Sequence, residues 1–337
     1  MGKSKAKSRV LIADDMSPLA QECFKQAGIE VDVKTGLDKQ GLGAIIGGYD
    51  GLVVRSATKV TSKVLEAAEN LKVIGRAGIG VDNIDVVAAT RLGIIVTNVP
   101  DYCVEEVADH VMALLLACAR RVVHYARETS LGRWDGGGAE ALPRLRGQTL
   151  GLVGFGNIAR RVVPRAHGFG LEVVAHTPRL TPDQAPAGVR VAKDLDELLE
   201  ISDYVSLHAP LHAATRSLID GEALARMRSS AYLINTARGA LVDEIALVGA
   251  LRRGDIAGAA IDVLDEEPPA ADHPLLALRS VVASPHIAYC SARSVAELQR
   301  RAASHVARSL AGETPPHVVN RQVLESPALR LRSGGVR

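Results

Sequence analysis

The 337-residue sequence lacks the features that would direct it to a membrane or an export route. No apolar run approaches the ~20 residues that a helix needs to cross a bilayer, so we predict no membrane span. The polar residues 3–7 precede an apolar stretch too short for a signal peptide, and Ala6 stands where a myristoylation site needs serine or threonine. We therefore expect a cytoplasmic protein.

Excess charge and clustered cysteine are also missing. The 40 Lys and Arg residues against 38 Asp and Glu leave a formal net charge of +2, which gives no overall electrostatic reason to bind nucleic acid. Cys23, Cys103, Cys118 and Cys290 have no metal-ligand spacing, so we expect free thiols and no metal. With 47% hydrophobic and 23% charged residues the composition is that of a globular protein, and the length predicts two domains.

Short apolar runs alternate with stretches of helical periodicity along most of the chain. Strands are expected at residues 10–13, 51–54, 72–74, 93–96, 149–153, 172–175, 204–207, 231–235, 258–263 and 280–283. Helices are expected at residues 18–27, 62–68, 104–123, 157–167, 195–199 and 292–310. This alternation predicts an α/β protein with doubly wound, Rossmann-like parallel sheets covered by helices on both faces.

A glycine-rich segment follows the expected strand at residues 149–153. Residues 154–159 read Gly-Phe-Gly-Asn-Ile-Ala and fit G-x-G-x-x-[G/A] between a strand and a helix, the context that a dinucleotide site requires. Gly154 permits the tight turn, and Gly156 lets the backbone approach a pyrophosphate. The amides of Asn157 and Ile158 at the start of the helix can bind that anion. The segment therefore predicts a dinucleotide cofactor.

The next strand ends without the acid that usually holds the adenosine ribose. His176, Thr177, Pro178 and Arg179 stand there instead. Arg179 can pair with a 2′-phosphate and Thr177 can donate a hydrogen bond to it, which favours NADP. If Arg179 is an ordinary surface arginine, NAD binds instead. We prefer NADP and keep NAD as the alternative.

Three side chains suited to one reaction follow three successive expected strands. Arg238, Glu267 and His286 each come shortly after a strand, and the carboxyl ends of parallel strands form the ligand crevice of such a sheet. A histidine can exchange a proton with the oxygen of a 2-hydroxy or 2-keto acid, and a carboxylate can orient its ring. An arginine can hold the substrate carboxylate. The trio predicts hydride transfer between a nicotinamide and a small 2-hydroxy acid.

The same segments resemble the D-isomer-specific 2-hydroxyacid dehydrogenases over residues 8–320. The motifs that carry the resemblance lie at residues 151–158, 208–211, 235–239, 262–268 and 284–288. The resemblance implies that Arg238 binds the substrate, that His286 is the acid–base group and that Glu267 is its partner. It also implies that Asp262 contacts the nicotinamide carboxamide. The expected cofactor residues are Gly154, Phe155, Gly156, Asn157, Ile158, His176, Thr177, Pro178, Arg179, His208, Ala209, Pro210, Thr236, Ala237, Arg238, Asp262, His286 and Ala288.

The resemblance further implies a cofactor domain inserted into the substrate domain. The dinucleotide-binding domain would be residues 99–287, the substrate domain residues 8–98 plus 288–320, and residues 1–7 and 321–337 loose tails. A homodimer is implied, with the helix at residues 104–123 at its interface. Burial within one chain explains the apolar stripe of that helix equally well.

The substrate stays open among three similarities. Residues 50–58 and 75–83 are similar to phosphoglycerate dehydrogenase, residues 98–110 and 285–291 to the C-terminal-binding-protein branch, and the missing ribose acid to glyoxylate and hydroxypyruvate reductases. The expected substrate residues are Arg55, Ser56, Arg76, Ala77, Gly78, Ile79, Tyr102, Arg238 and His286. We therefore expect a reductase or dehydrogenase of a phosphoglycerate-, hydroxypyruvate- or glyoxylate-like acid. The alternative is a dinucleotide-sensing, corepressor-like binding protein on the same fold.

Overall fold

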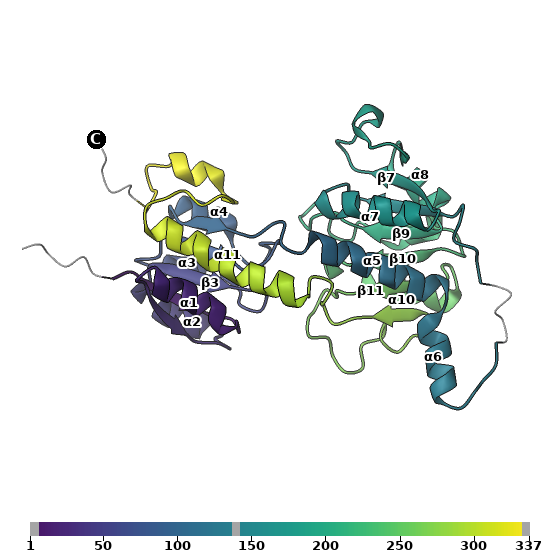
Figure 1. Cartoon of the computed structure of the whole chain (residues 1–337), viewed down its shortest axis with the longest axis horizontal. Helices are drawn as coiled ribbons and strands as arrows, with labels where there is room; N and C mark the ends of the chain where they lie inside the picture. Colours follow the sequence, from purple (N-terminus) through teal and green to yellow (C-terminus); the bar gives the residue numbers. More distant parts are fainter. Residues whose placement is uncertain (1–6, 137–141, 332–337) are drawn as a thin grey trace, which may run out of the picture. The chain divides into compact units, whose positions relative to one another are not determined.

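The computed structural model describes residues 7–136 and 142–331, which form two compact units (Figure 1). Unit 1 extends to Tyr102 and resumes at Ser291, and unit 2 runs from Cys103 to Cys290. The chain thus leaves unit 1, completes unit 2 and returns. The expected boundaries, 98/99 and 287/288, differ from these by three or four residues. The assignment of the units to substrate and cofactor stays a prediction.

Unit 1 is built on a parallel sheet in the order β2-β1-β3-β4-β5. Its strands are β1 (Arg9–Ile12), β2 (Glu30–Val33), β3 (Gly51–Val54), β4 (Val73–Arg76) and β5 (Ile95–Thr97). Its helices are α1 (Pro18–Gln26), α2 (Lys39–Ile45), α3 (Ser62–Glu66), α4 (Val86–Arg91) and α11 (Ala292–Leu310). The strand order reverses between β1 and β3, and such a switch point is where doubly wound sheets bind ligands.

The helix α11 returns from unit 2 to cover one face of the unit 1 sheet, beside α1 (Figure 1). A Cβ on Gly75 would lie 2.5 Å from Cγ2 of Val306, and one on Gly51 would lie 2.9 Å from its Cγ1. The two glycines therefore let the helix lie close on β3 and β4. The opposite face is buried by α2, α3 and α4, which contribute Leu42, Val64 and Ala88 to the core.

Unit 2 holds a parallel sheet in the order β12-β11-β10-β9-β6-β7-β8. Its strands are β6 (Thr149–Val153), β7 (Glu172–His176), β8 (Val189–Val191), β9 (Tyr204–Leu207), β10 (Tyr232–Asn235), β11 (Gly258–Ile261) and β12 (Val281–Ala283). Its helices are α5 (Val104–Ala119), α6 (Val122–Ser130), α7 (Asn157–Gly168), α8 (Leu195–Ile201), α9 (Gly221–Arg226) and α10 (Glu244–Arg253). Helices α5 and α7 cover one face, and α8, α9 and α10 cover the other. The predicted fold class is confirmed in both units.

Two expectations about single elements were wrong. The helix expected over residues 104–123 is two helices, because Arg121 between α5 and α6 has a φ of 47°, which a right-handed helix cannot contain. Residues 321–331 are not a loose tail. The 3₁₀ helix η5 (Arg321–Glu325) buries Val323 completely, and Nη1 of Arg330 donates to the carbonyl of Leu71 at 3.0 Å. Residues 1–6 and 332–337 of the expected tails lie outside the described residues.

Residues 7–136 and 142–331 contain neither a membrane-spanning helix nor a cluster of metal-binding side chains. No helix in these ranges combines the length and the apolarity needed to cross a bilayer. The same residues hold no group of three or more His, Cys, Asp or Glu side chains arranged to bind a metal ion. The four cysteines are free thiols, and burial raises the pKa of the Cys118 thiol to about 12.

Candidate active site

The side chains of His286 and Glu267 lie within ion-pair distance of each other at the carboxyl edge of the unit 2 sheet. Nδ1 of His286 lies 2.6 Å from Oε2 of Glu267, and Oε1 of Glu267 accepts the Leu264 N–H at 2.9 Å. The two side chains keep 35% and 33% of their surface exposed. The imidazole is thus fixed through Nδ1, and Nε2 remains as the ring atom for a bound molecule.

Glu267 is held in its charged form. Burial acts to raise the pKa of its carboxyl, but hydrogen bonds from His286 and Leu264 and the charges of His286 and Arg238 outweigh burial. The net effect is a pKa below the usual value. A carboxylate that stays ionised can orient the imidazole and balance a positive charge on it.

Arg238 follows β10 and reaches the same edge. Nδ2 of Asn235, the last residue of β10, donates to the Arg238 carbonyl at 2.8 Å. Gly239 allows this turn to touch the segment after β11, because a Cβ there would lie 1.9 Å from the carbonyl carbon of Leu264. Since β10, β11 and β12 are neighbours, the structure brings the predicted catalytic trio together.

Asp262 clamps the main chain around His286. The φ of His286 is 52°, in the left-handed region that residues other than glycine rarely adopt. The Asp262 carbonyl accepts the His286 N–H at 2.8 Å, and its carboxylate accepts the N–H groups of Ile287 at 3.0 Å and Ala288 at 2.8 Å. The Asp262 side chain is fully buried. Its implied contact with a nicotinamide stays a prediction.

The glycine turn after β6 leaves an open surface at the start of α7. Gly154 has a φ of 93°, and a Cβ there would lie 2.7 Å from the carbonyl carbon of His208. A Cβ on Gly156 would meet nothing within 4 Å, and no side chain caps the helix there. The first N–H groups of α7, from Asn157 onward, are therefore available to an anion.

A buried hydroxyl points to a bound partner along the same edge. Oγ1 of Thr236 is buried and has no hydrogen-bond partner among the described residues. An unpaired buried hydroxyl is unfavourable, so a ligand atom would satisfy it. Together with the open surface over Gly156, this fits a dinucleotide lying across β6, β9 and β10. Burial lowers the pKa of nearby His208 to about 4, so its ring is neutral and shares a hydrogen bond with Ser206.

The segment after β7 lies beside the glycine turn. The Gly154 N–H donates to the His176 carbonyl at 2.8 Å, which ties the end of β7 to the start of the phosphate-binding segment. Thr177 is half-buried, and Pro178 and Arg179 are exposed. Residues 176–182 contain no acid. The expected cofactor-selecting residues are therefore placed where an adenosine ribose would lie in a doubly wound sheet.

The expected substrate arginines belong to unit 1, at the carboxyl edge of its own sheet. Arg55 follows β3 and Arg76 ends β4. Nδ2 of Asn83 donates to the carbonyls of Arg55 at 2.7 Å and Thr58 at 2.8 Å, and its Oδ1 lies 3.5 Å from Nε of Arg76. The Arg76 guanidinium covers Gly78, where a Cβ would lie 1.4 Å from Nη1.

The remaining substrate candidates lie around the same turn of unit 1. Ile79 accepts a hydrogen bond from Nδ2 of Asn98 at 2.6 Å, Ser56 is exposed next to Arg55, and Tyr102 is buried. Sequence reasoning gave no role to Asn83, His110 or Ser284. Each is a polar residue inside a segment that carries the family resemblance, and that position was the available signal.

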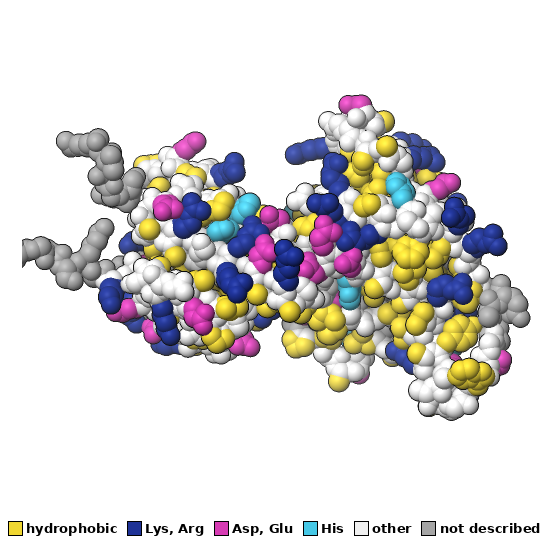
Figure 2. Space-filling view, viewed as in Figure 1, with side chains coloured by type: hydrophobic (Ala, Val, Ile, Leu, Met, Phe, Trp, Pro, Cys, Tyr) yellow, Lys and Arg dark blue, Asp and Glu magenta, His cyan; other side chains and the backbone are white. Residues whose placement is uncertain are grey.

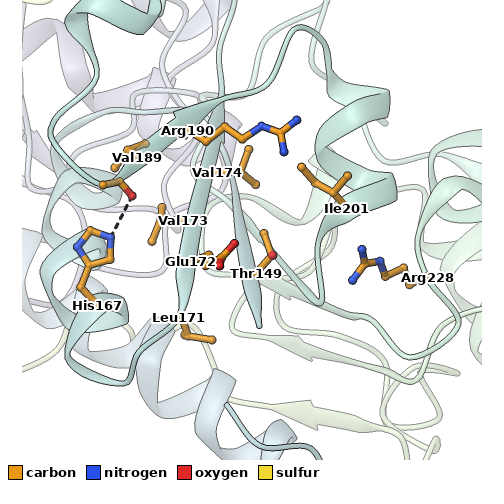
Figure 3. Close-up of a pocket in the computed structure, with 11 residues that line it drawn as sticks. Thr149, His167, Leu171, Glu172, Val173, Val174, Val189, Arg190, Ile201 and Arg228 are labelled. Atoms are coloured by element: carbon orange, nitrogen blue, oxygen red, sulfur yellow. Dashed lines mark hydrogen bonds between the residues drawn. The ribbon is translucent and has the colours of Figure 1, made fainter. Parts of the chain in front are cut away.

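A separate hollow lies at the other end of the unit 2 strands (Figure 3). It has a volume of about 760 Å³ and includes Thr149 and Glu172, the first residues of β6 and β7. Its two arginines, Arg190 and Arg228, pair with Glu197 and Asp203. This hollow therefore lies opposite the edge that carries the site and contributes no residue to it.

Comparison with known proteins agrees with this geometry. Residues 112–288 match the family described as D-isomer specific 2-hydroxyacid dehydrogenase, NAD binding domain. A D-3-phosphoglycerate dehydrogenase of Methanocaldococcus jannaschii is 43% identical over 317 residues, which cover 93% of this chain and 59% of that protein. This chain thus spans about three fifths of that relative.

Two other relatives are similar over most of their own length. A hydroxypyruvate reductase of Thermotoga maritima is 44% identical over 269 residues, 79% of this chain and 85% of that protein. A crystal structure of an NADPH-dependent glyoxylate/hydroxypyruvate reductase from Sinorhizobium meliloti, in complex with NADP and malonate, is 28% identical with a TM-score of 0.85. That match covers 98% of this chain and 100% of the other.

Proposed function

The chain belongs to the D-isomer-specific 2-hydroxyacid dehydrogenase family, and we propose that it transfers a hydride between a nicotinamide cofactor and a small anionic 2-hydroxy or 2-keto acid. The observation that carries this proposal is the His286–Glu267 pair, 2.6 Å apart, beside Arg238 at the edge that also holds the open glycine turn. No observation on the described residues favours the corepressor-like alternative.

The proposed mechanism assigns one task to each side chain. When bound, the nicotinamide supplies the hydride in reduction and accepts it in oxidation. Arg238 holds the substrate carboxylate and stabilises negative charge on the reacting oxygen. His286 gives a proton from Nε2 to that oxygen during reduction and removes it during oxidation. Glu267 keeps the imidazole in place through Nδ1 throughout.

The proposed cofactor contacts follow the carboxyl edge of unit 2. The turn from Gly154 to Ile158 would hold the pyrophosphate, and Thr236 Oγ1 would gain the partner that it lacks among the described residues. We propose NADP over NAD, because Arg179 and Thr177 follow β7 where an acid would repel a 2′-phosphate.

We propose that Arg55 and Arg76 recognise the anionic substrate. Two such arginines favour an acid that carries a phosphate or another polar group besides its carboxylate. The relatives described above are named for phosphoglycerate, hydroxypyruvate and glyoxylate. The deciding experiment measures turnover of glyoxylate, hydroxypyruvate, phosphohydroxypyruvate and phosphonopyruvate with NADH and NADPH side by side. If the protein reduces none of the four acids with either cofactor, the proposed function is contradicted.

Two variants test the assigned roles in the same assay. His286→Ala should lower kcat by a factor on the order of 100 to 10,000, as loss of an acid–base group does. Arg238→Lys should raise KM as well as lower kcat, because an ammonium cannot hold a carboxylate through two parallel hydrogen bonds. Near wild-type turnover of His286→Ala would refute its assignment.

The cofactor preference has its own test. Arg179→Ala should raise the KM for NADPH about tenfold or more and leave the KM for NADH nearly unchanged, because a charge-assisted hydrogen bond to the 2′-phosphate is lost. Arg226→Ala, an exposed arginine on α9, is the matched control. A wild-type enzyme that strongly prefers NADH would rule out the NADP assignment.

We also propose a homodimer formed through α6 and residues 131–136. The apolar stripe of α5 is buried inside unit 2, so it needs no partner chain. By contrast, α6 buries none of its residues, and Leu131 and Trp134 are 64% and 91% exposed. Figure 2 shows hydrophobic side chains gathered near the carboxyl end of α5 and beside α6. In a homodimer, the same surface of a second chain would cover these exposed hydrophobic side chains.

Sedimentation equilibrium tests the dimer. The wild type should have twice the 35.6 kDa mass of one chain, and Leu131→Ser with Trp134→Ser should shift it toward one chain. Val87→Ser, which replaces an 82% exposed valine on unit 1, should leave the mass unchanged. A monomeric wild type at micromolar concentration would contradict the proposal.

A further inference from the structure

A chain of hydrogen bonds connects helix α5 to the carboxylate that clamps His286. Nε2 of His110 lies 2.9 Å from Oγ of Ser284, and the Ser284 hydroxyl donates to Oδ1 of Asp262 at 2.6 Å. Because the hydroxyl proton points to Asp262, the Ser284 oxygen accepts and Nε2 of His110 is the donor. Nε2 of His110 is also 3.6 Å from the same carboxylate oxygen.

Both oxygens of the buried Asp262 carboxylate accept hydrogen bonds in their present positions. Oδ2 accepts the Ala288 N–H, and Oδ1 accepts the Ile287 N–H together with the Ser284 hydroxyl. A buried carboxylate is tolerated only when its oxygens are hydrogen-bonded. A rotation of this group would break the two main-chain bonds that follow His286. The contact from Ser284, supported in turn by His110, opposes that rotation.

We propose that His110 is a positioning residue for His286, acting through Ser284 and Asp262. The inference rests on the proposed role of His286 in proton transfer. His286 has a φ of 52°, and such a conformation persists only where the surrounding structure holds it. Loss of the His110 donor frees the Asp262 carboxylate to turn and lets the His286 segment relax. The imidazole of His286 is then less well positioned for proton transfer, although no group that touches substrate has been removed.

The experiment compares variants of the full chain in the turnover assay. His110→Met removes the donor, His110→Gln keeps an N–H near the position of Nε2, and Ser284→Ala removes the central hydroxyl. His167→Gln, an exposed histidine on α7, is the matched control. We measure kcat, the KM of each reactant and the melting temperature. The ¹⁵N shifts of the His286 ring report its hydrogen bond to Glu267 directly.

His110→Met should lower kcat about tenfold to a hundredfold, as small displacements of a catalytic group do, with each KM within about twofold of wild type. His110→Gln should recover most of the loss. Ser284→Ala should match His110→Met, and the double variant should be no worse than either one, because both break the same chain of contacts. An altered ¹⁵N shift of His286 in Ser284→Ala supports the inference even if His110→Met folds poorly.

The positioning role alone would be overturned if Ser284→Ala and His110→Met both keep wild-type kcat and an unchanged ¹⁵N shift of His286, while His286→Ala is inactive. Additive losses in the double variant would overturn it too. If His286→Ala itself keeps wild-type turnover, the proposed function fails, and the positioning role fails with it.

Discussion

Nδ1 of His286 and Oε2 of Glu267 lie 2.6 Å apart, although 19 residues separate them in the chain. Both are fixed by the segment that follows β11. The His286 N–H donates to the carbonyl of Asp262, and the Glu267 carboxylate accepts the N–H of Leu264. The pair is therefore positioned before any ligand binds, which reduces the reorganisation needed in the reaction.

Replacing Glu267 with Gln should slow the reaction while leaving the fold in place. The amide keeps the shape of the side chain but loses the charge that balances a protonated imidazole. We expect kcat to fall about tenfold to a hundredfold, part of the 100- to 10,000-fold that acid–base catalysis supplies. Steady-state kinetics measures this, with Glu266→Gln as the control next in sequence. Equal losses in the two variants would count against a special role for Glu267.

The same substitution has a consequence for stability in acid. The pKa of Glu267 lies below its ordinary value of 4.5, so its contribution to stability is present above that value and is lost as the pH falls through the folded pKa. The difference in free energy of unfolding between wild type and Glu267→Gln should therefore be constant near neutral pH and shrink below about pH 4.5. A difference that grows in acid would contradict the assigned direction.

Gly156→Ala should separate cofactor binding from folding. A methyl there meets no protein atom within 4 Å, so the melting temperature of the free protein should stay unchanged. It would, however, project into the surface that a pyrophosphate must approach, and we expect the cofactor Kd to rise about tenfold or more. Calorimetric titration measures this, with Gly168→Ala at the other end of α7 as the control. Unchanged Kd would place the pyrophosphate elsewhere.

The central strands, and the positions of Arg238, Glu267 and His286 after them, were predictable because central parallel strands are continuous apolar runs. Such strands are buried on both faces, so the polar residue that ends each run marks the edge of the sheet. The strands β2 and β8 were not predicted. Each lies at a sheet edge and is only partly buried, so neither contains an uninterrupted apolar run.

The hydrogen bonds that hold the site residues in place could not be predicted from sequence patterns. His110 and Ser284 are 174 residues apart, and Asn83 contacts the carbonyl of Arg55 across 28 residues. Periodicity describes which face of an element is buried, whereas these contacts depend on how elements pack. The break at Arg121 was missed for a related reason, because the apolar stripe continues across it to Val123.

Gly78→Ala should displace the Arg76 guanidinium. The new Cβ would lie 1.4 Å from its Nη1, so the flexible side chain has to move away. If Arg76 binds the substrate as proposed, the substrate KM should rise about tenfold to a hundredfold, the loss expected for a hydrogen bond to a charged group. Cofactor binding should be unaffected. Gly36→Ala is the control, since it imposes a positive φ of 71° on alanine without touching an arginine. An unchanged KM would remove Arg76 from the substrate site.

His305 should make unit 1 sensitive to acid. Burial, and then the charges of His317 and Arg301, lowers the pKa of His305 to about 4, against an ordinary value of 6.5. Above pH 6.5 the ring is neutral in both the folded and the unfolded state. As the pH falls from 6.5 to 4, only the unfolded state gains the proton, and unit 1 loses on the order of 3 kcal/mol.

Hydrogen exchange of the α11 amides measures that loss in unit 1 separately from unit 2. His305→Asn should keep a hydrogen bond to Thr97, which lies 3.2 Å from Nδ1 of the wild-type ring, and should remove most of the decrease in protection between pH 6.5 and 4. His212→Asn, which replaces an exposed histidine on unit 2, should retain the full decrease. An undiminished decrease in His305→Asn would show that a group other than His305 takes up the proton.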